Sequence, residues 1–250
     1  GDHRDLHLSI RRQRQMCIRD SSETDGLNGF TGLDDATSVA TFTNGTTPYA
    51  VVTGTADHCV TVVQLNQPNN ISAGVSKCNE AGGQDTTLGP QLATPRDVEV
   101  WQNDNGTYAI IASQHDDAIQ ILDLSGVEEG HIETHWNYSS SSARSSTNDE
   151  YGQAVLADAY DVAIFQNVSA NGVMGPVAVV AAFGDNGIQA FNLRDLDDAT
   201  SLQGIVPVGN ITNSDALQRQ LQGNLVLDGP TGVDVFYVDA VSYTHLRAHE

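Results

Sequence analysis

Basic side chains are scarce in this sequence. Only 11 Lys and Arg stand against 32 Asp and Glu over 250 residues, so the formal net charge is −21. Nucleic acids and anionic membranes need a cationic surface, and this charge therefore disfavours both as partners. An acidic surface fits cations, basic partners, or simple solubility in salty surroundings.

Long apolar runs and familiar catalytic motifs are also missing. No run of 18 or more apolar residues occurs, so the segment seen contains no predicted transmembrane helix. A signal peptide or an anchor could lie outside it. No G-x-S-x-G, P-loop or G-x-G-x-x-G stands between a strand and a helix, and the spacing of the acidic residues singles out no pair for acid–base catalysis. The sequence therefore favours a protein without catalysis, and it leaves an enzyme open.

Both ends resemble translated sequencing adapters. Residues 1–20 (GDHRDLHLSIRRQRQMCIRD) and 241–250 (VSYTHLRAHE) match in-frame translations of adapters used in transposase-based sequencing libraries, and Ser21 and Ala240 fit the junction codons. We predict that 1–21 and 241–250 are adapter-derived. Residues 22–240 are then the native part, a fragment cut at both ends with five basic and 28 acidic residues. The alternative for the N-terminal segment is a basic arm, such as a nucleic-acid tail or a targeting peptide.

Two cysteines lie outside the segments predicted to be adapter-derived. Cys59 begins the run CVTVVQL and Cys78 ends the run ISAGVSKC. If these runs form a hairpin in which Leu65 pairs with Ser72, Cys59 lies opposite Cys78, which is a workable geometry for a cross-strand disulfide. Two unrelated thiols are the alternative.

Six N-x-[ST] sequons favour the secretory route, although about three or four would arise by chance in an Asn/Ser/Thr-rich chain. With the cysteine pair, they predict an extracellular or cell-surface location. The candidate glycosylation sites are Asn44, Asn70, Asn105, Asn137, Asn167 and Asn210.

A pattern Leu-x5-Val-x-x-[Phe/Trp] occurs four times without a gap. The copies are LDDATSVATF from Leu33, LATPRDVEVW from Leu92, LADAYDVAIF from Leu156 and LDGPTGVDVF from Leu227. In each, a short polar stretch leads into a strand. The first three continue into ungapped 17-residue blocks at 49–65, 108–124 and 177–193, each an apolar run, a turn and an alternating run, which is typical of a β-hairpin. A further apolar run follows at 71–78, 130–136 and 203–208.

Units of about four strands with variable loops describe propeller blades better than a sandwich. We predict an all-β fold, an incomplete β-propeller of four-stranded blades with about three full blades and the start of a fourth, its units beginning near 33, 92, 156 and 227. Propellers close with about four to eight blades, so we expect exposed apolar blade faces at the ends of the array. Only 214–223 is a short helix candidate.

The phrases AIQILDLSG and FGDNGIQAFNL resemble LVIVD-type repeat proteins, whose blades end in a pattern like G-[LVI]-x-[IV]-x-D-[LIV]-S. The resemblance covers most of 25–240, although Gln64 and Asn192 replace the aspartate of the motif. It implies an extracellular or cell-surface propeller, and it supplies no catalytic residues.

Aspartates recur at the turn of the hairpin block. Oxygen-rich loops suit Ca²⁺, so calcium is the one cofactor that the sequence suggests, although turn formation already accounts for Asp there. A transition metal is less favoured, because the four histidines outside the ends (His58, His115, His131 and His135) do not recur with the unit. The candidate calcium ligands are Asp57, Asp116, Asp117 and Asp185.

Two functions follow from these features. The favoured one is a secreted or cell-surface propeller module for interaction with, or adhesion to, an extracellular protein or glycan, using loops at one rim of the blades. The alternative is a calcium-dependent hydrolase or phosphatase-like propeller with an acidic metal-binding channel. The scarcity of basic residues to hold phosphate counts against the second.

Overall fold

The computed structural model describes residues 24–26, 29–66, 70–79, 90–140, 154–169, 172–193, 196, 206–212, 227–238 and 241–248. These residues form 14 strands and one 3-10 turn, η1 (Val127–Glu129), and no α-helix occurs among them. The predicted all-β class is confirmed. The helix candidate 214–223 lies outside the described residues.

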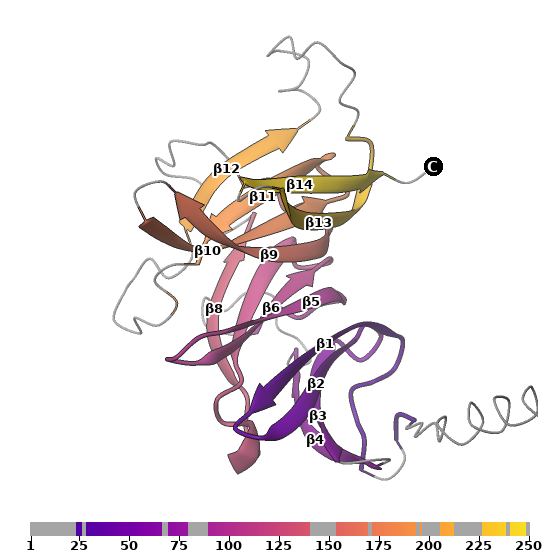
Figure 1. The fold of residues 1–250 in the computed structure, drawn as a ribbon. Helices are drawn as coiled ribbons and strands as arrows, with labels where there is room; N and C mark the ends of the chain where they lie inside the picture. Colours follow the sequence, from indigo (N-terminus) through magenta and orange to yellow (C-terminus); the bar gives the residue numbers. More distant parts are fainter. Residues whose placement is uncertain are drawn as a thin grey trace, which may run out of the picture.

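Three four-stranded antiparallel sheets follow one another along the chain, and in each the spatial order of the strands is the chain order (Figure 1). Unit 1 is β1 (Ala36–Asn44), β2 (Thr47–Gly54), β3 (Cys59–Asn66) and β4 (Asn70–Cys78). Unit 2 is β5 (Pro95–Gln102), β6 (Thr107–Ser113), β7 (Ala118–Asp123) and β8 (Glu133–Ser139). Unit 3 is β9 (Ala159–Ser169), β10 (Gly172–Ala182), β11 (Gly187–Asn192) and β12 (Val206–Thr212).

A hairpin of β13 (Pro230–Val238) and β14 (Val241–Ala248) begins unit 4. The predicted architecture of three full blades and the start of a fourth is confirmed. The strand β14 falls in the segment predicted to be adapter-derived, and the origin of these residues stays a prediction.

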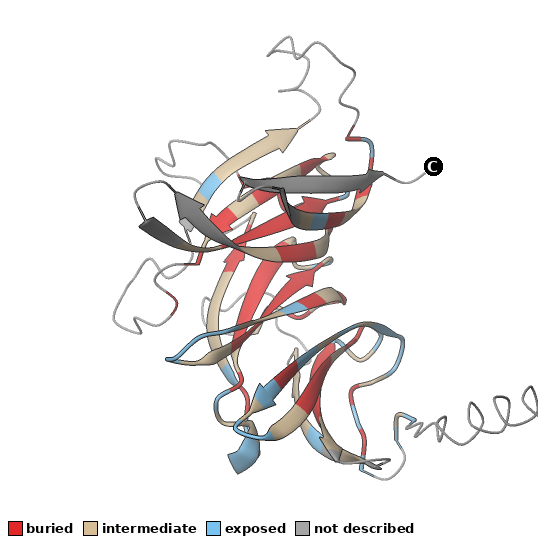
Figure 2. Ribbon diagram, in the orientation of Figure 1, coloured by how far each residue is buried: buried red, intermediate tan, exposed pale blue. Residues whose placement is uncertain are grey.

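The repeated sequence pattern gives the same strand pairing in each unit. The repeated Val is Val39, Val98 and Val162 in units 1, 2 and 3, and it lies opposite Val52, Ile111 and Val180 respectively. The second and third strands of unit 2 are buried along almost their whole length (Figure 2). Neighbouring units cover both of their faces, and the strands are correspondingly apolar.

The fourth strand of unit 2 begins three residues later than predicted, at Glu133. In unit 3 it is described from Val206, and the predicted start at 203 lies outside the described residues. In unit 2 the reason is visible. After η1, Gly130 adopts a left-handed conformation, and the His131 N–H donates back to the carbonyl of Gly126, so 130–131 belong to a turn.

The predicted disulfide between Cys59 and Cys78 is confirmed. These cysteines are paired across β3 and β4. The predicted register at the other end of the hairpin is wrong by one residue, because Leu65 lies opposite Ile71 and not Ser72. A register irregularity between Val62 and Gln64 absorbs the difference.

The first strands of successive units lie side by side, in the order β1, β5, β9 and β13. Each unit packs one apolar face on the unit before it. Val98, Ile111 and Leu122 of unit 2 share a core with Val51, Val60 and Val62 of unit 1. The equivalent residues of unit 3, Val162, Val180 and Phe191, share a core with Ile110, Ile119 and Ile121 of unit 2.

In unit 1 no described unit packs on this same face; Phe30 and Leu33 cover part of it, and the repeated Val is left exposed. Val39 is 62% exposed, whereas its equivalents Val98, Val162 and Val233 are 2%, 2% and 8% exposed. A cavity of about 390 Å³ opens on this face, and its lining includes Phe30, Leu33, Val52, Val63 and Ile71.

Candidate binding surface

The turn between the second and third strands of each unit meets the loop that leads into the first strand. The turns are 55–58, 114–117 and 183–186, and in each the second residue donates its N–H to a loop carbonyl: Ala56 to Asp34, His115 to Ala93 and Gly184 to Ala157. Because the sheets are antiparallel meanders, these turns and loops lie at one end of every unit. We call this end the turn rim.

The third residue of each turn is the recurring aspartate. The carboxylates of Asp57, Asp116 and Asp185 accept the N–H of Asp34, Ala93 and Ala157 over 3.1, 2.8 and 2.9 Å. Burial raises the pKa of the Asp116 carboxyl, and the hydrogen bond from Ala93 opposes that rise. In all three units the aspartate binds the entry loop of its own blade.

The fourth residue of each turn reaches the next unit. His58, Asp117 and Asn186 have φ of 56°, 49° and 51°, a left-handed conformation in which Asn, Asp and His are enriched. The Nδ1 of His58 accepts the Thr94 N–H over 2.9 Å. The Oδ1 atoms of Asp117 and Asn186 accept the N–H of Asp158 and Gly229, each over 2.8 Å. We call these three contacts the inter-unit latch.

The predicted calcium ligands are therefore distributed over three turns and bond backbone N–H groups there. Asp116 and Asp117 are neighbours, whereas Asp57 and Asp185 belong to other units. In the described part of the chain, no group of three or more His, Cys, Asp or Glu residues is arranged to hold a metal ion. Calcium binding stays a prediction.

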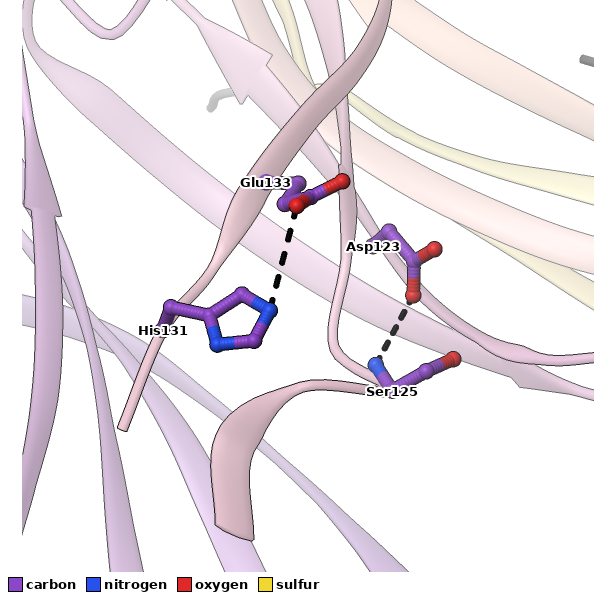
Figure 3. Close-up of polar contacts among 4 residues, drawn as sticks. All are labelled: Asp123, Ser125, His131 and Glu133. Atoms are coloured by element: carbon purple, nitrogen blue, oxygen red, sulfur yellow. Dashed lines mark hydrogen bonds and ion pairs between the residues drawn. The ribbon is translucent and has the colours of Figure 1, made fainter. Parts of the chain in front are cut away.

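The other histidines also have partners in the protein. The Nδ1 of His115 lies 2.9 Å from Thr94 Oγ1, and the Nε2 of His135 lies 2.6 Å from the Leu196 carbonyl. Figure 3 shows His131 beside Glu133, with 3.8 Å between Nε2 and Oε1, where the two side chains are 53% and 72% exposed. In the same view Asp123 accepts the Ser125 N–H over 2.8 Å.

Two buried glutamines in the third strands were missed by sequence reasoning. Gln120 accepts the Gln91 N–H and donates to the Ile121 and Trp136 carbonyls, each over 2.8 Å. Gln189 makes the same three kinds of contact, with Val155, Ala190 and Gly209. The sequence feature that could have identified them is the Ile-Gln pair that AIQILDL and GIQAFNL share at the same position.

The turn rim also carries positions whose residues differ from unit to unit. The second residue of the first strand and the first residue of the turn are Thr37 with Thr55 in unit 1, Arg96 with Gln114 in unit 2, and Tyr160 with Phe183 in unit 3. We call the last four residues the rim patch.

The rim patch joins units 2 and 3 through side chains. Arg96 Nε donates to Gln114 Oε1 over 2.6 Å, and its guanidinium lies 5.3 Å from the centre of the Tyr160 ring. The Tyr160 and Phe183 rings are 6.4 Å apart. Phe183 is 41% exposed, and it packs so closely on Gly229, at φ 55°, that a Cβ there would meet its ring at 2.7 Å. Exposed aromatic rings beside a guanidinium are enriched in binding surfaces.

Four candidate glycosylation sites lie at the opposite rim. Asn44, Asn105 and Asn167 lie at or near the β1–β2, β5–β6 and β9–β10 turns, and Asn70 begins β4 after the β3–β4 connection. Asn105 is exposed, and Asn44, Asn137 and Asn210 are partly exposed. The side chains of Asn70 and Asn167 lie outside the described residues. Glycan attachment stays a prediction at all six.

No family model matches the chain, and no curated protein matches it. Among solved structures, it is similar to a functionally unknown protein from Desulfotomaculum acetoxidans, at 15% identity and a TM-score of 0.44 over 70% of this chain and 42% of that one. An exo-β-1,3-galactanase from Phanerochaete chrysosporium matches at 12% identity and a TM-score of 0.47 over 93% and 48%. A periplasmic gluconolactonase from Pseudomonas aeruginosa matches at 9% identity and a TM-score of 0.39 over 65% and 36%.

The chain thus spans less than half the length of these three structures, and similarity this low carries no argument about activity. Within the described residues, no helix has the length and apolar character needed to cross a membrane.

Proposed function

We propose that this chain is part of a secreted or cell-surface β-propeller that binds an extracellular protein or glycan through the rim patch. The observation that carries the proposal is the contrast at the turn rim. The turn aspartates and the latch residues accept the equivalent backbone N–H in each of units 1 to 3. The rim patch has no such common contact, and its Phe183 ring is exposed.

A rigid scaffold with variable residues at one rim is how repeat proteins present binding surfaces. The disulfide supports the location, because disulfides persist in oxidising compartments. The resemblance to LVIVD-type repeats supports it as well. Net negative charge at the molecule's surface favours a neutral or basic partner.

The test is the variant Phe183→Ala, measured on a glycan array and against immobilised extracellular-matrix proteins. We expect the chain to bind at least one of these probes and the variant to lose roughly tenfold or more in affinity, because truncating a central aromatic costs about 1–2 kcal/mol or more. The matched control is Val208→Ala, which removes another exposed apolar side chain (38%) from β12. It should bind as the unchanged chain does.

Equal binding by Phe183→Ala and the unchanged chain would place the interaction elsewhere. Absence of binding to every probe, together with calcium-dependent hydrolysis of an ester or phosphate substrate, would contradict the proposal and favour the enzymatic alternative.

A further inference from the structure

Two equivalent carboxyl groups meet where the first strands of units 2 and 3 adjoin. Asp97 on β5 and Asp161 on β9 each stand directly before the repeated Val. Asp97 Oδ2 accepts the N–H of Val162 over 2.9 Å, and Asp161 Oδ2 accepts the N–H of Val233 over 2.5 Å. Each carboxyl therefore binds the first strand of the following unit.

Because Val162 directly follows Asp161, the bond from the Val162 N–H to Asp97 brings the two carboxyl groups close together across the joint. Two ionised carboxylates at close range repel each other, so a proton on one of the two is favoured. Asp97 already accepts from Val162 and, over 2.5 Å, from the Ser38 hydroxyl. These two bonds stabilise Asp97 as a carboxylate, so Asp161 is the group that favours the proton.

The surroundings of the pair disfavour a second negative charge. Burial and the neighbouring Asp97 raise the pKa of Asp161 to about 7. Glu99 on β5 adds negative charge near Asp161, and Asp234 on β13 adds negative charge near Glu99. From β1 the contact is the uncharged Ser38, and the Arg96 guanidinium is engaged with Gln114 and Tyr160.

We propose that Asp97 and Asp161 form a proton-dependent clasp between units 2 and 3, which holds β9 against β5 while Asp161 is protonated and loosens when that proton is lost. Loss of the proton leaves two adjacent negative charges across the joint.

The direction of the pH dependence follows from linkage. The folded protein holds the Asp161 proton up to about pH 7, whereas an unfolded Asp releases it near pH ~4. The stabilisation is therefore fully present below about pH 4 and is lost progressively as the pH rises through 7.

The experiment compares thermal unfolding of the full chain and its Asp161→Asn variant between about pH 4.5 and 8.5, with a chelator present. The amide side chain introduced by this substitution keeps an acceptor for the Val233 N–H and is uncharged at every pH. We expect the Tm of the unchanged chain, relative to the variant, to fall by about 5 °C or more over this range, with a midpoint near pH 7. A difference that stays constant across the range would overturn the proposal.

Asp185→Asn is the matched control. It also replaces a carboxylate that accepts a backbone N–H, but in a turn, and its Tm difference from the unchanged chain should not vary through pH ~7. If Asp161→Asn fails to fold, the protonation of Asp161 can be followed in the unchanged chain by the NMR chemical shifts of its carboxyl ¹³C atoms as the pH is raised. One Asp should titrate near pH 7, and titration of every Asp below about pH 5.5 would contradict the clasp.

Discussion

At the residue scale, three different side chains make the same contact. His58, Asp117 and Asn186 each hold a left-handed backbone and each accept an N–H from the following unit. What they share is a hydrogen-bond acceptor close to Cα, and imidazole, carboxylate and amide groups all provide one. The latch therefore tolerates change of residue type while its geometry is kept.

This makes Asp117 a sharp test of the latch. Asp117→Ala leaves the Asp158 N–H without its acceptor and places Ala at φ 49°. We expect a loss of about 1–3 kcal/mol in the free energy of unfolding, measured by urea denaturation. Asp117→Asn should change it by less than about 0.5 kcal/mol, because Asn186 makes the same contact in unit 3. Equal losses in the two variants would mean that the charge of Asp117, and not its acceptor, is what matters.

At the element scale, each sheet follows from local signals in the chain. Short turns join the first three strands of each of units 1 to 3, and consecutive strands pair as antiparallel meanders. The edge strand β4 has an additional, covalent connection. Among the described strands, β4 pairs only with β3. The disulfide from Cys59 to Cys78 links the end of β4 covalently to β3.

The disulfide should accordingly stabilise unit 1. It closes a loop over the 19-residue separation of Cys59 and Cys78, and a bridge of this span contributes about 3 kcal/mol by restricting the unfolded chain. We expect the double variant Cys59→Ser, Cys78→Ser to unfold at lower urea concentration. Dithiothreitol should lower the stability of the unchanged chain to a similar extent and leave the double variant unaffected. An effect of the reductant on the double variant would show that it acts elsewhere.

At the scale of the whole molecule, stability comes from one unit covering the apolar face of the next. The repeated Val of the sequence pattern therefore occurs in two environments. In unit 1 it is Val39, which is largely exposed, and in unit 2 it is Val98, which is buried. Val98→Thr buries a hydroxyl in the core between units 1 and 2, which we expect to cost about 1–3 kcal/mol in unfolding free energy. Val39→Thr should stay within about 0.5 kcal/mol of the unchanged chain. Similar costs at both positions, measured by urea denaturation, would mean that the face of unit 1 is covered in solution.

The sequence by itself determined the strands, the number of units, the positions of the turn aspartates and the cysteine pair. These depend on alternation, turn residues and hairpin spacing, all of which act over fewer than about 20 residues. The register slip at Leu65 shows the limit even there, because a one-residue irregularity leaves no mark in the spacing.

Only the tertiary structure decided which unit receives each polar side chain. The sequence shows Asp57 and His58 as neighbours in one turn, but Asp57 bonds its own unit and His58 the next. The pairing of Asp97 with Asp161 and the assembly of the rim patch from units 2 and 3 likewise join residues far apart in the chain. Such contacts depend on how one sheet is placed against another, which is set by the packing of whole apolar faces and not by any local pattern.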